Sequence, residues 1–352
     1  MTTAASKQLG YIPALDGLRA AAVMLVVFSH TRVLGFQNGD FGVEMFFVLS
    51  GFLISTLLLQ EMDGTGGINV PHFYARRLLR LYPALLLFLL LYAVAAHALH
   101  VDFMRDVFIA GFYLTDYAVT FGAASPGSLV NHTWSLSVEE QFYLLWPLAL
   151  PGLGKIVSKK RLPAVLLALA LVALAREFIP FLMGADWTTV YFRFDARLGG
   201  LLLGACLAAC RRAKIDIPFK AWGLALSGIA LAICMMVPVG YTGGLLETPA
   251  AQAFTFFLLA SLLENKASLL RDMFEAPGAV FLGRISYGVY LFHYPIAVIL
   301  REYLSWPLAC LVTFAASTGI AWFSWSTVER IGRLKSSAFR GKSGLMPAGQ
   351  GA

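Results

Sequence analysis

Apolar runs of about 20 residues recur along the whole chain, separated by short polar stretches. A helix of this length spans the roughly 30 Å hydrocarbon core of a bilayer. The pattern predicts ten membrane-spanning helices, over residues 12–35, 41–60, 78–97, 137–152, 163–182, 190–210, 217–238, 249–264, 282–301 and 306–328. The apolar stretch 104–121 is a weaker candidate, interrupted by Asp106, Gly111 and Asp116, so we expect it to lie in a long loop or a re-entrant segment.

The composition supports an all-α, polytopic membrane helix bundle. Of 352 residues, 59% are hydrophobic and 13% are charged, whereas soluble domains carry about 25% charged residues. The first apolar run contains Arg19 and lacks a small-residue cleavage site, so we interpret it as a retained helix rather than a signal peptide. We expect one membrane domain over residues 1–330 and a disordered basic tail over 331–352.

The basic residues predict the orientation of the bundle. If the N-terminus is cytoplasmic, ten spans place nearly every Lys and Arg cluster on the cytoplasmic side, as the positive-inside rule requires, and the C-terminus is cytoplasmic too. An eleventh span would place the later Lys and Arg clusters on the outer side of the membrane. The net charge of +7 is therefore a topology signal, and we expect no nucleic-acid partner.

Common soluble chemistries find no support in the sequence. The four cysteines lie in apolar runs without metal-ligand spacing, so we expect buried thiols, no disulfide framework and no metal site. The chain contains neither a Gly-x-Ser-x-Gly elbow nor a His-Glu-x-x-His motif.

Arg19 and His30 lie in the same predicted helix, eleven positions apart. At 100° per residue both point from one face, about 16 Å apart along the helix axis. A charge at mid-membrane costs at least about 2.5–3.5 kcal/mol, so an aligned pair favours a polar cavity inside the bundle. The alternative is that each side chain reaches the nearer membrane surface.

Two acids are candidates for a partner of His30. Glu44 lies near the predicted outer end of the second helix, at the depth of His30, and Glu139 lies in the first turn of the fourth helix with Tyr143 one turn further on. A carboxylate beside a histidine fixes its tautomer and raises its basicity. The alternatives are that Glu44 faces outer water and that Glu139 or Glu140 only stabilises a helix N-terminus.

The third and ninth helices carry further candidates. Arg77 and Arg80 share a face, and guanidinium groups bind phosphate oxygens through two hydrogen bonds; anchoring to lipid headgroups is the alternative. His293 lies one turn from Tyr290 inside the ninth helix, where a packing role is the alternative.

Six segments, taken together and in order, resemble the acyltransferase-3 superfamily of integral membrane acyltransferases. They are YIPALDGLRAAAVMLVVFSH, GVEMFFVLSGFLIS, FYARRLLRLYP, HTWSLSVEEQFYLLWP, RLGGLLLG and ISYGVYLFHYP. The resemblance covers roughly residues 10–330 and implies a ten-helix enzyme of the bacterial inner membrane. It would move an acyl group, commonly acetyl, from cytoplasmic acyl-CoA to a hydroxyl of an extracytoplasmic acceptor. The family's Arg-x10-His pair corresponds to Arg19 and His30, and its Arg-x-x-Arg pair to Arg77 and Arg80.

This resemblance gives a hypothesis for the site. Arg19, Arg76, Arg77 and Arg80 would bind acyl-CoA, which serves as donor substrate with no permanently bound cofactor. His30 would act as catalytic base or acyl carrier, oriented by Glu139 or else by Glu44. The predicted supporting and acceptor residues are Glu44, Trp134, Glu140, Tyr143, Arg197, Tyr290 and His293. Some relatives carry a further periplasmic domain; this chain ends too soon for one, so we expect its outer loops to recognise the acceptor.

The acceptor and one competing function stay open. A surface glycan such as lipopolysaccharide O-antigen, an exopolysaccharide, a Nod-factor sugar, peptidoglycan or a macrolide would each fit, and the oligomeric state is not predicted. A transporter or flippase also places charges inside a membrane bundle, although the broken helices in paired halves that are typical of transporters are not visible in this sequence.

Overall fold

The computed structural model describes residues 10–35, 40–125, 127–218, 220–236, 243–264 and 268–338, and their regular elements are helices. The longer helices are α1 (Pro13–His30), α2 (Asp40–Thr65), α3 (Val70–Ala98), α6 (Trp134–Ile156), α7 (Leu162–Leu182), α9 (Phe194–Ala213), α10 (Lys220–Met236), α11 (Gly243–Leu262), α14 (Ser286–Leu300) and α15 (Trp306–Ser326). Shorter elements are η1 (Val33–Gly35), α4 (Met104–Gly111), α5 (Thr115–Thr120), η2 (Asn131–Thr133), α8 (Trp187–Tyr191), α12 (Leu269–Glu275), α13 (Pro277–Arg284) and α16 (Val328–Ala338).

The predicted all-helical fold is confirmed. Each of the ten apolar segments contains most of one long helix; residues 219, 237 and 238 of the segment 217–238 lie outside the described part of the chain. The stretch 104–121 forms the two short helices α4 and α5 instead of one span. Five described helices are long and apolar enough to cross a membrane, over Pro13–His30, Phe41–Thr65, Val70–Ala98, Leu162–Pro180 and Trp306–Leu334. The other expected spans are shorter or carry more polar residues, so the number of crossings stays a prediction.

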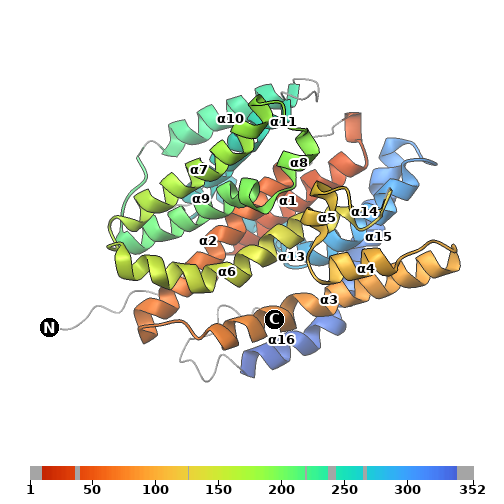
Figure 1. The fold of residues 1–352 in the computed structure, drawn as a ribbon, viewed down its shortest axis with the longest axis horizontal. Helices are drawn as coiled ribbons and strands as arrows, with labels where there is room; N and C mark the ends of the chain where they lie inside the picture. Colours follow the sequence, from red (N-terminus) through yellow and green to blue (C-terminus); the bar gives the residue numbers. More distant parts are fainter. Residues whose placement is uncertain are drawn as a thin grey trace.

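The first residues of the expected tail continue a helix, and the boundary between membrane domain and tail stays a prediction. Residues 331–338 belong to α16, which packs along α3 (Figure 1). Gly332 lies so close to the carbonyl of Leu79 that a Cβ atom would collide with it. Arg333 also donates a hydrogen bond to the carbonyl of Trp325 (2.6 Å). These contacts hold the start of the expected tail against the bundle, and residues 339–352 lie outside the described part of the chain.

Helix α2 lies at the centre of the bundle. In an 18-residue apolar stretch of α2, 72% of the residues are buried, whereas 22% are buried in the corresponding stretch of α3. It packs against α1, α9 and α11. Figure 1 shows α7, α9, α10 and α11 on one side of α1 and α2, and α3 with α16 on the other. Large apolar side chains such as Leu90, Val172 and Leu311 face outward from the peripheral helices, which suits a lipid environment rather than water.

Two glycines let α2 and α9 cross closely. A Cβ on Gly51 would collide with the backbone of Leu201, and one on Gly204 with the backbone of Val48. Small residues allow this kind of close backbone approach between membrane helices. The crossing fixes α2, and therefore Ser50 and Glu44, relative to the rest of the bundle.

We expect Gly204→Ala to lower the free energy of unfolding by about 1–3 kcal/mol, because the new methyl group forces α2 and α9 apart. Thermal unfolding of the detergent-solubilised protein measures the effect. Gly319→Ala in α15 is the matched control, since no atom lies within 4 Å of its added Cβ. Equal stability of the two variants would contradict the close crossing.

Candidate functional site

A small polar cavity lies inside the bundle, between α1, α2, α6 and α14. Its volume is about 40 Å³. Its lining combines Arg19 of α1, Ser50 of α2, Ser135 and Glu139 of α6, and Ser286, Tyr287 and Tyr290 of α14, with Val43, Phe46, Phe47 and Leu136 as apolar walls. A cation, a carboxylate and several hydroxyl groups therefore face one partly open space.

The predicted common face of Arg19 and His30 is confirmed. Arg19 Nε donates to Ser286 Oγ (3.2 Å), and His30 Nδ1 lies 3.1 Å from His293 Nε2. Ser286 and His293 are two turns apart on α14. One neighbouring helix thus contacts both ends of the Arg19–His30 face. Both side chains therefore point into the bundle and not toward lipid.

His30 belongs to a cluster of rings that we call the histidine cluster: His30, His132, Tyr290, His293 and Tyr294. The ring centroids of His30 lie 5.1 Å from His293 and 4.9 Å from Tyr294. His132 stacks on Tyr294 at 4.8 Å and lies 5.7 Å from His293. Sequence reasoning assigns no role to His132 or Tyr294, because the approach of η2 to α14 is not visible in either segment alone.

Tyr290 and Ser135 both line the cavity and lie next to His132, so they join the cavity to the rest of the histidine cluster. The Tyr290 hydroxyl donates to the carbonyl of His132 (3.0 Å) and lies 2.6 Å from Ser135 Oγ. With its own proton directed to His132, Tyr290 accepts the hydrogen bond of Ser135. The predicted adjacency of Tyr290 and His293 is confirmed by their ring distance of 5.4 Å.

In the described part of the chain, no hydrogen bond joins Glu139 to the ring of His30, so their predicted pairing is not seen in this structure. Glu139 Oε1 accepts a hydrogen bond from Ser50 Oγ (2.7 Å), at the cavity that Arg19 lines. Glu139 lies seven residues after His132, about 10 Å further along the helix axis and away from the histidine cluster to which His132 belongs. Among the described residues, the ring of His30 bonds instead to Val26 O and His293.

Glu44 is not a partner of His30 either. It belongs to a buried ion network in which Arg197 Nη1 donates to Glu44 Oε1 (2.8 Å) and Arg197 Nη2 lies 3.2 Å from Glu177 Oε1. Gln252 Nε2 donates to Glu44 Oε2 (2.7 Å). The side chains of Arg197, Glu44 and Glu177 are at most 1% exposed. Arg197 and Glu44 therefore join α9 to α2. Their contacts indicate this structural role and not the predicted supporting or acceptor role.

The predicted arginines fall into two groups. The Arg77 guanidinium lies over the Tyr143 ring, 3.3 Å from its centroid, and 3.5 Å from Glu140. Arg80 is exposed, lies within electrostatic range of Arg19 and Arg77, and forms no ion pair with any carboxylate in the described part of the chain. Arg76 instead lies 3.7 Å from Glu61 of α2, which sets it apart from the cationic group formed by Arg19, Arg77 and Arg80.

Three aromatic residues of α6 point into the bundle. Trp134 packs edge-on against Tyr191 (5.3 Å) and Phe47 (6.2 Å). Tyr143 and Trp146 are buried, so neither takes the place in an interfacial aromatic belt that is the ordinary alternative for such residues. Trp134 supports the wall of the cavity through Phe47, and Tyr143 supports Arg77.

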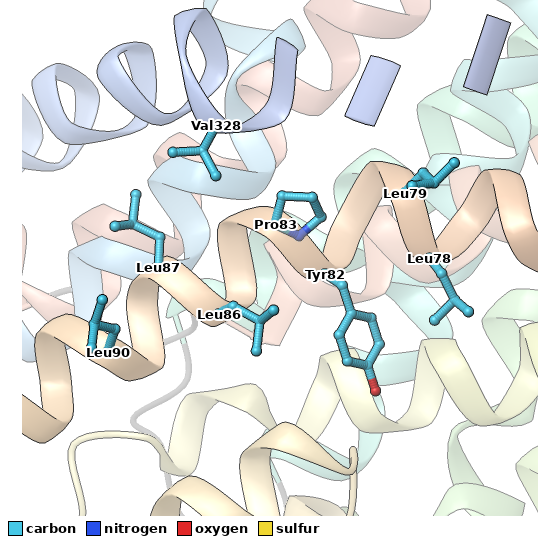
Figure 2. A pocket seen from close by; sticks show the side chains of 8 residues that line it. All are labelled: Leu78, Leu79, Tyr82, Pro83, Leu86, Leu87, Leu90 and Val328. Atoms are coloured by element: carbon cyan, nitrogen blue, oxygen red, sulfur yellow. The ribbon is translucent and has the colours of Figure 1, made fainter. Parts of the chain in front are cut away.

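A larger groove lies on the outside of the bundle, along α3. It has a volume of about 800 Å³ and is lined by Leu78, Leu79, Tyr82, Pro83, Leu86, Leu87, Leu90 and Val328. Figure 2 shows Val328 of α16 opposite Pro83 and Leu87, with Tyr82 pointing away from it; the Tyr82 hydroxyl donates to Gly111 O (3.2 Å). This lining holds no acid, base or cation, so the groove is not the candidate site.

A helical bundle with an apolar outside and a cavity lined by polar groups is typical of an integral membrane protein. The chain belongs to the acyltransferase-3 family: the family's acyltransferase domain matches residues 12–327. It is 31% identical over 313 residues to a peptidoglycan O-acetyltransferase, OatA, of Listeria monocytogenes, and 33% identical over 321 residues to an O-acetyltransferase, OatA, of Staphylococcus aureus.

These matches cover 81% and 83% of this chain, but 49% and 52% of the relatives. The chain therefore spans about half the length of the curated relatives it matches. No solved structure matches the chain.

Proposed function

We propose that this protein transfers an acyl group, most simply acetyl, from acyl-CoA to a hydroxyl of a cell-surface glycan. The observation that carries the proposal is a line of polar groups. It begins at the exposed Arg80, passes Arg77 and Arg19, and leads through the cavity to the histidine cluster. Family membership and the names of the relatives support the same reaction. The proposal includes ten crossings, cytoplasmic termini and a bacterial inner membrane, with 1–330 as the membrane domain.

The cationic group of Arg19, Arg77 and Arg80 is the proposed binding site for the donor. Acyl-CoA carries several phosphate charges, and guanidinium forks bind such oxygens strongly. Only Arg77 of the three lies within 4 Å of a carboxylate among the described residues. Glu139 and Glu140 lie within electrostatic range of this group. Arg19 and Arg80 nevertheless have no direct carboxylate contact in the part of the chain that the structure describes, which leaves their guanidinium groups available to an anion. Arg76, held by Glu61, contributes less.

His30 is the proposed site of the chemistry, at the other end of α1. As a base it takes the acceptor's hydroxyl proton while the oxygen attacks the thioester carbonyl. The carbon–sulfur bond breaks, and the thiolate of CoA receives the proton from the imidazole. As an acyl carrier, His30 would instead attack the thioester first and then pass the acyl group to the hydroxyl. Both routes yield one ester and one CoA thiol.

The donor's pantetheine arm needs more room than the cavity offers. Its volume of about 40 Å³ is well below the roughly 300–1,000 Å³ that pockets for small ligands have. The Ser135–Tyr290 hydrogen bond joins α6 to α14 where the cavity lies next to His132. We propose that acyl-CoA binding separates α6 from α14 at this contact, so that the thioester reaches His30.

Peptidoglycan is the acceptor class that the comparisons favour, because the Listeria monocytogenes relative is named for it, while neither OatA relative is named for lipopolysaccharide. The purified protein in liposomes tests this. CoA release from acetyl-CoA that depends on an added N-acetylglucosamine oligosaccharide supports an acyltransferase. Passage of intact acetyl-CoA into the liposomes without release of thiol would instead support a transporter.

We expect Arg80→Gln and Arg19→Gln each to raise the KM for acetyl-CoA by about ten- to a hundredfold, since a hydrogen bond to a charged group contributes about 1.5–3 kcal/mol. Arg76→Gln is the matched control and should change KM little, because Glu61 holds Arg76. Acetyl-pantetheine, which lacks the phosphates, should be used equally well by all three variants. An equal loss with acetyl-pantetheine would mean that the arginines do not bind phosphate.

A further inference from the structure

The ring nitrogens of His293 and His30 form a chain with a defined direction. His293 Nδ1 lies 2.6 Å from the carbonyl oxygen of Tyr290. A carbonyl only accepts hydrogen bonds, so Nδ1 of His293 carries the proton. In the neutral ring, Nε2 of His293 then holds a lone pair. That lone pair faces His30 Nδ1 at 3.1 Å.

The same reasoning fixes the tautomer of His30. An Nε2 lone pair on His293 requires His30 Nδ1 to donate. Independently, His30 Nδ1 lies 3.1 Å from the carbonyl oxygen of Val26, which also requires a donor. Two acceptors therefore hold the proton on Nδ1, and the lone pair of neutral His30 is on Nε2.

We infer that His293 is the positioning residue of the reaction: it holds His30 as the Nδ1–H tautomer and leaves His30 Nε2 as the atom that takes the proton or the acyl group. This inference rests on the proposed function. It replaces the carboxylate partner that the sequence suggests, because a neutral imidazole provides the same acceptor without placing a second charge inside the bundle.

The surroundings of His30 suit this arrangement. The charged and titratable groups that face it are Arg301, whose Nη1 donates to the backbone oxygen of His30 (3.4 Å), and Tyr294, His132 and His293. No carboxylate bonds to its ring among the described residues. When Nε2 takes the hydroxyl proton, the Nδ1–H bond to His293 strengthens, and the proton then leaves with the CoA thiolate.

Nitrogen NMR of the full chain in lipid bilayers, labelled with ¹⁵N-histidine, tests the tautomer directly. Protonated and unprotonated ring nitrogens have distinct shifts, and His30→Ala identifies the signals of His30 by their loss. We expect a protonated Nδ1 and an unprotonated Nε2 for His30 in the unaltered protein. A proton on Nε2 of neutral His30 would overturn the inference, whatever the activity.

Kinetics of two variants then separate positioning from packing. His293→Leu fills a similar space without an acceptor, and we expect kcat to fall about ten- to a hundredfold with the KM for acetyl-CoA unchanged. The loss is smaller than that of the base itself, because Val26 O still accepts. His293→Gln offers an amide oxygen near the position of Nε2 and should recover much of kcat.

The outcomes distinguish this inference from the proposed function. If His293→Leu leaves kcat and the His30 tautomer unchanged, His293 only packs. If the Leu and Gln variants lose equal activity, the acceptor is irrelevant and the inference fails again. Full activity in His30→Ala would instead refute the role of His30 in the proposed function. Should His293→Leu not fold, the ring nitrogens of His293 in the unaltered chain decide: a proton on its Nε2, which faces His30, would refute its role as acceptor.

Discussion

Acyl transfer should fall by about 10²–10⁴-fold when His30 is replaced with alanine, the range that a positioned general base contributes. The residual rate comes from donor binding alone, so the KM for acetyl-CoA should stay close to that of the unaltered protein. CoA release with an N-acetylglucosamine oligosaccharide, measured on protein purified from the membrane, gives both constants.

His97→Ala is the matched control for this experiment. His97 lies on the exposed end of α3, in edge contact with Phe103 and far along the chain from the histidine cluster. Its loss should leave kcat unchanged. If His30→Ala retains full transfer while it inserts into the membrane as well as the control does, the chemistry does not take place at His30. If the acyl-carrier route holds, acetyl-CoA alone should label His30, and no label should appear in the alanine variant.

Helical spacing was sufficient to predict the line from Arg19 to His30. The period of 3.6 residues depends only on local geometry, so two residues eleven positions apart had to share a face. The structure adds the neighbour, α14, which meets that face through Ser286 and His293. The apolar runs likewise sufficed for the helices, because length and hydropathy are local properties.

The partners of His30 could not be predicted in the same way. Glu44 and Glu139 were reasonable candidates by depth, but depth along a helix says nothing about which neighbour it faces. His132 reaches the cluster through η2, a single turn before α6, and Glu44 turns to Arg197 because α2 crosses α9 at Gly51 and Gly204. These contacts depend on helix packing, for which one sequence carries no periodic signal.

The largest effect on stability should come from Arg197→Met. Arg197 is the cation that contacts both Glu44 and Glu177, and all three side chains are buried. Breaking a buried ion pair by removal of one partner costs about 3–5 kcal/mol, since a charge is left without compensation. We expect a large fall in the unfolding temperature of the solubilised protein. Arg176→Met is the control: it breaks the Arg176–Asp195 pair, whose side chains are 51% and 40% exposed, and should cost less than about 1 kcal/mol.

A second variant shows whether the instability of Arg197→Met comes from the unpaired buried charges or from the changed shape of the side chain. The triple variant Arg197→Met, Glu44→Gln and Glu177→Gln removes all three formal charges, and buried ion networks can be replaced by neutral side chains with little net loss of stability. We expect it to unfold at a clearly higher temperature than Arg197→Met alone. It should also transfer acyl groups, because neither Arg197 nor Glu44 contacts the ring of His30. A triple variant that folds but is inactive would return Arg197 and Glu44 to the site, as the sequence first suggested. If Arg197→Met is as stable as the control, the buried network does not hold α2, α7 and α9 together.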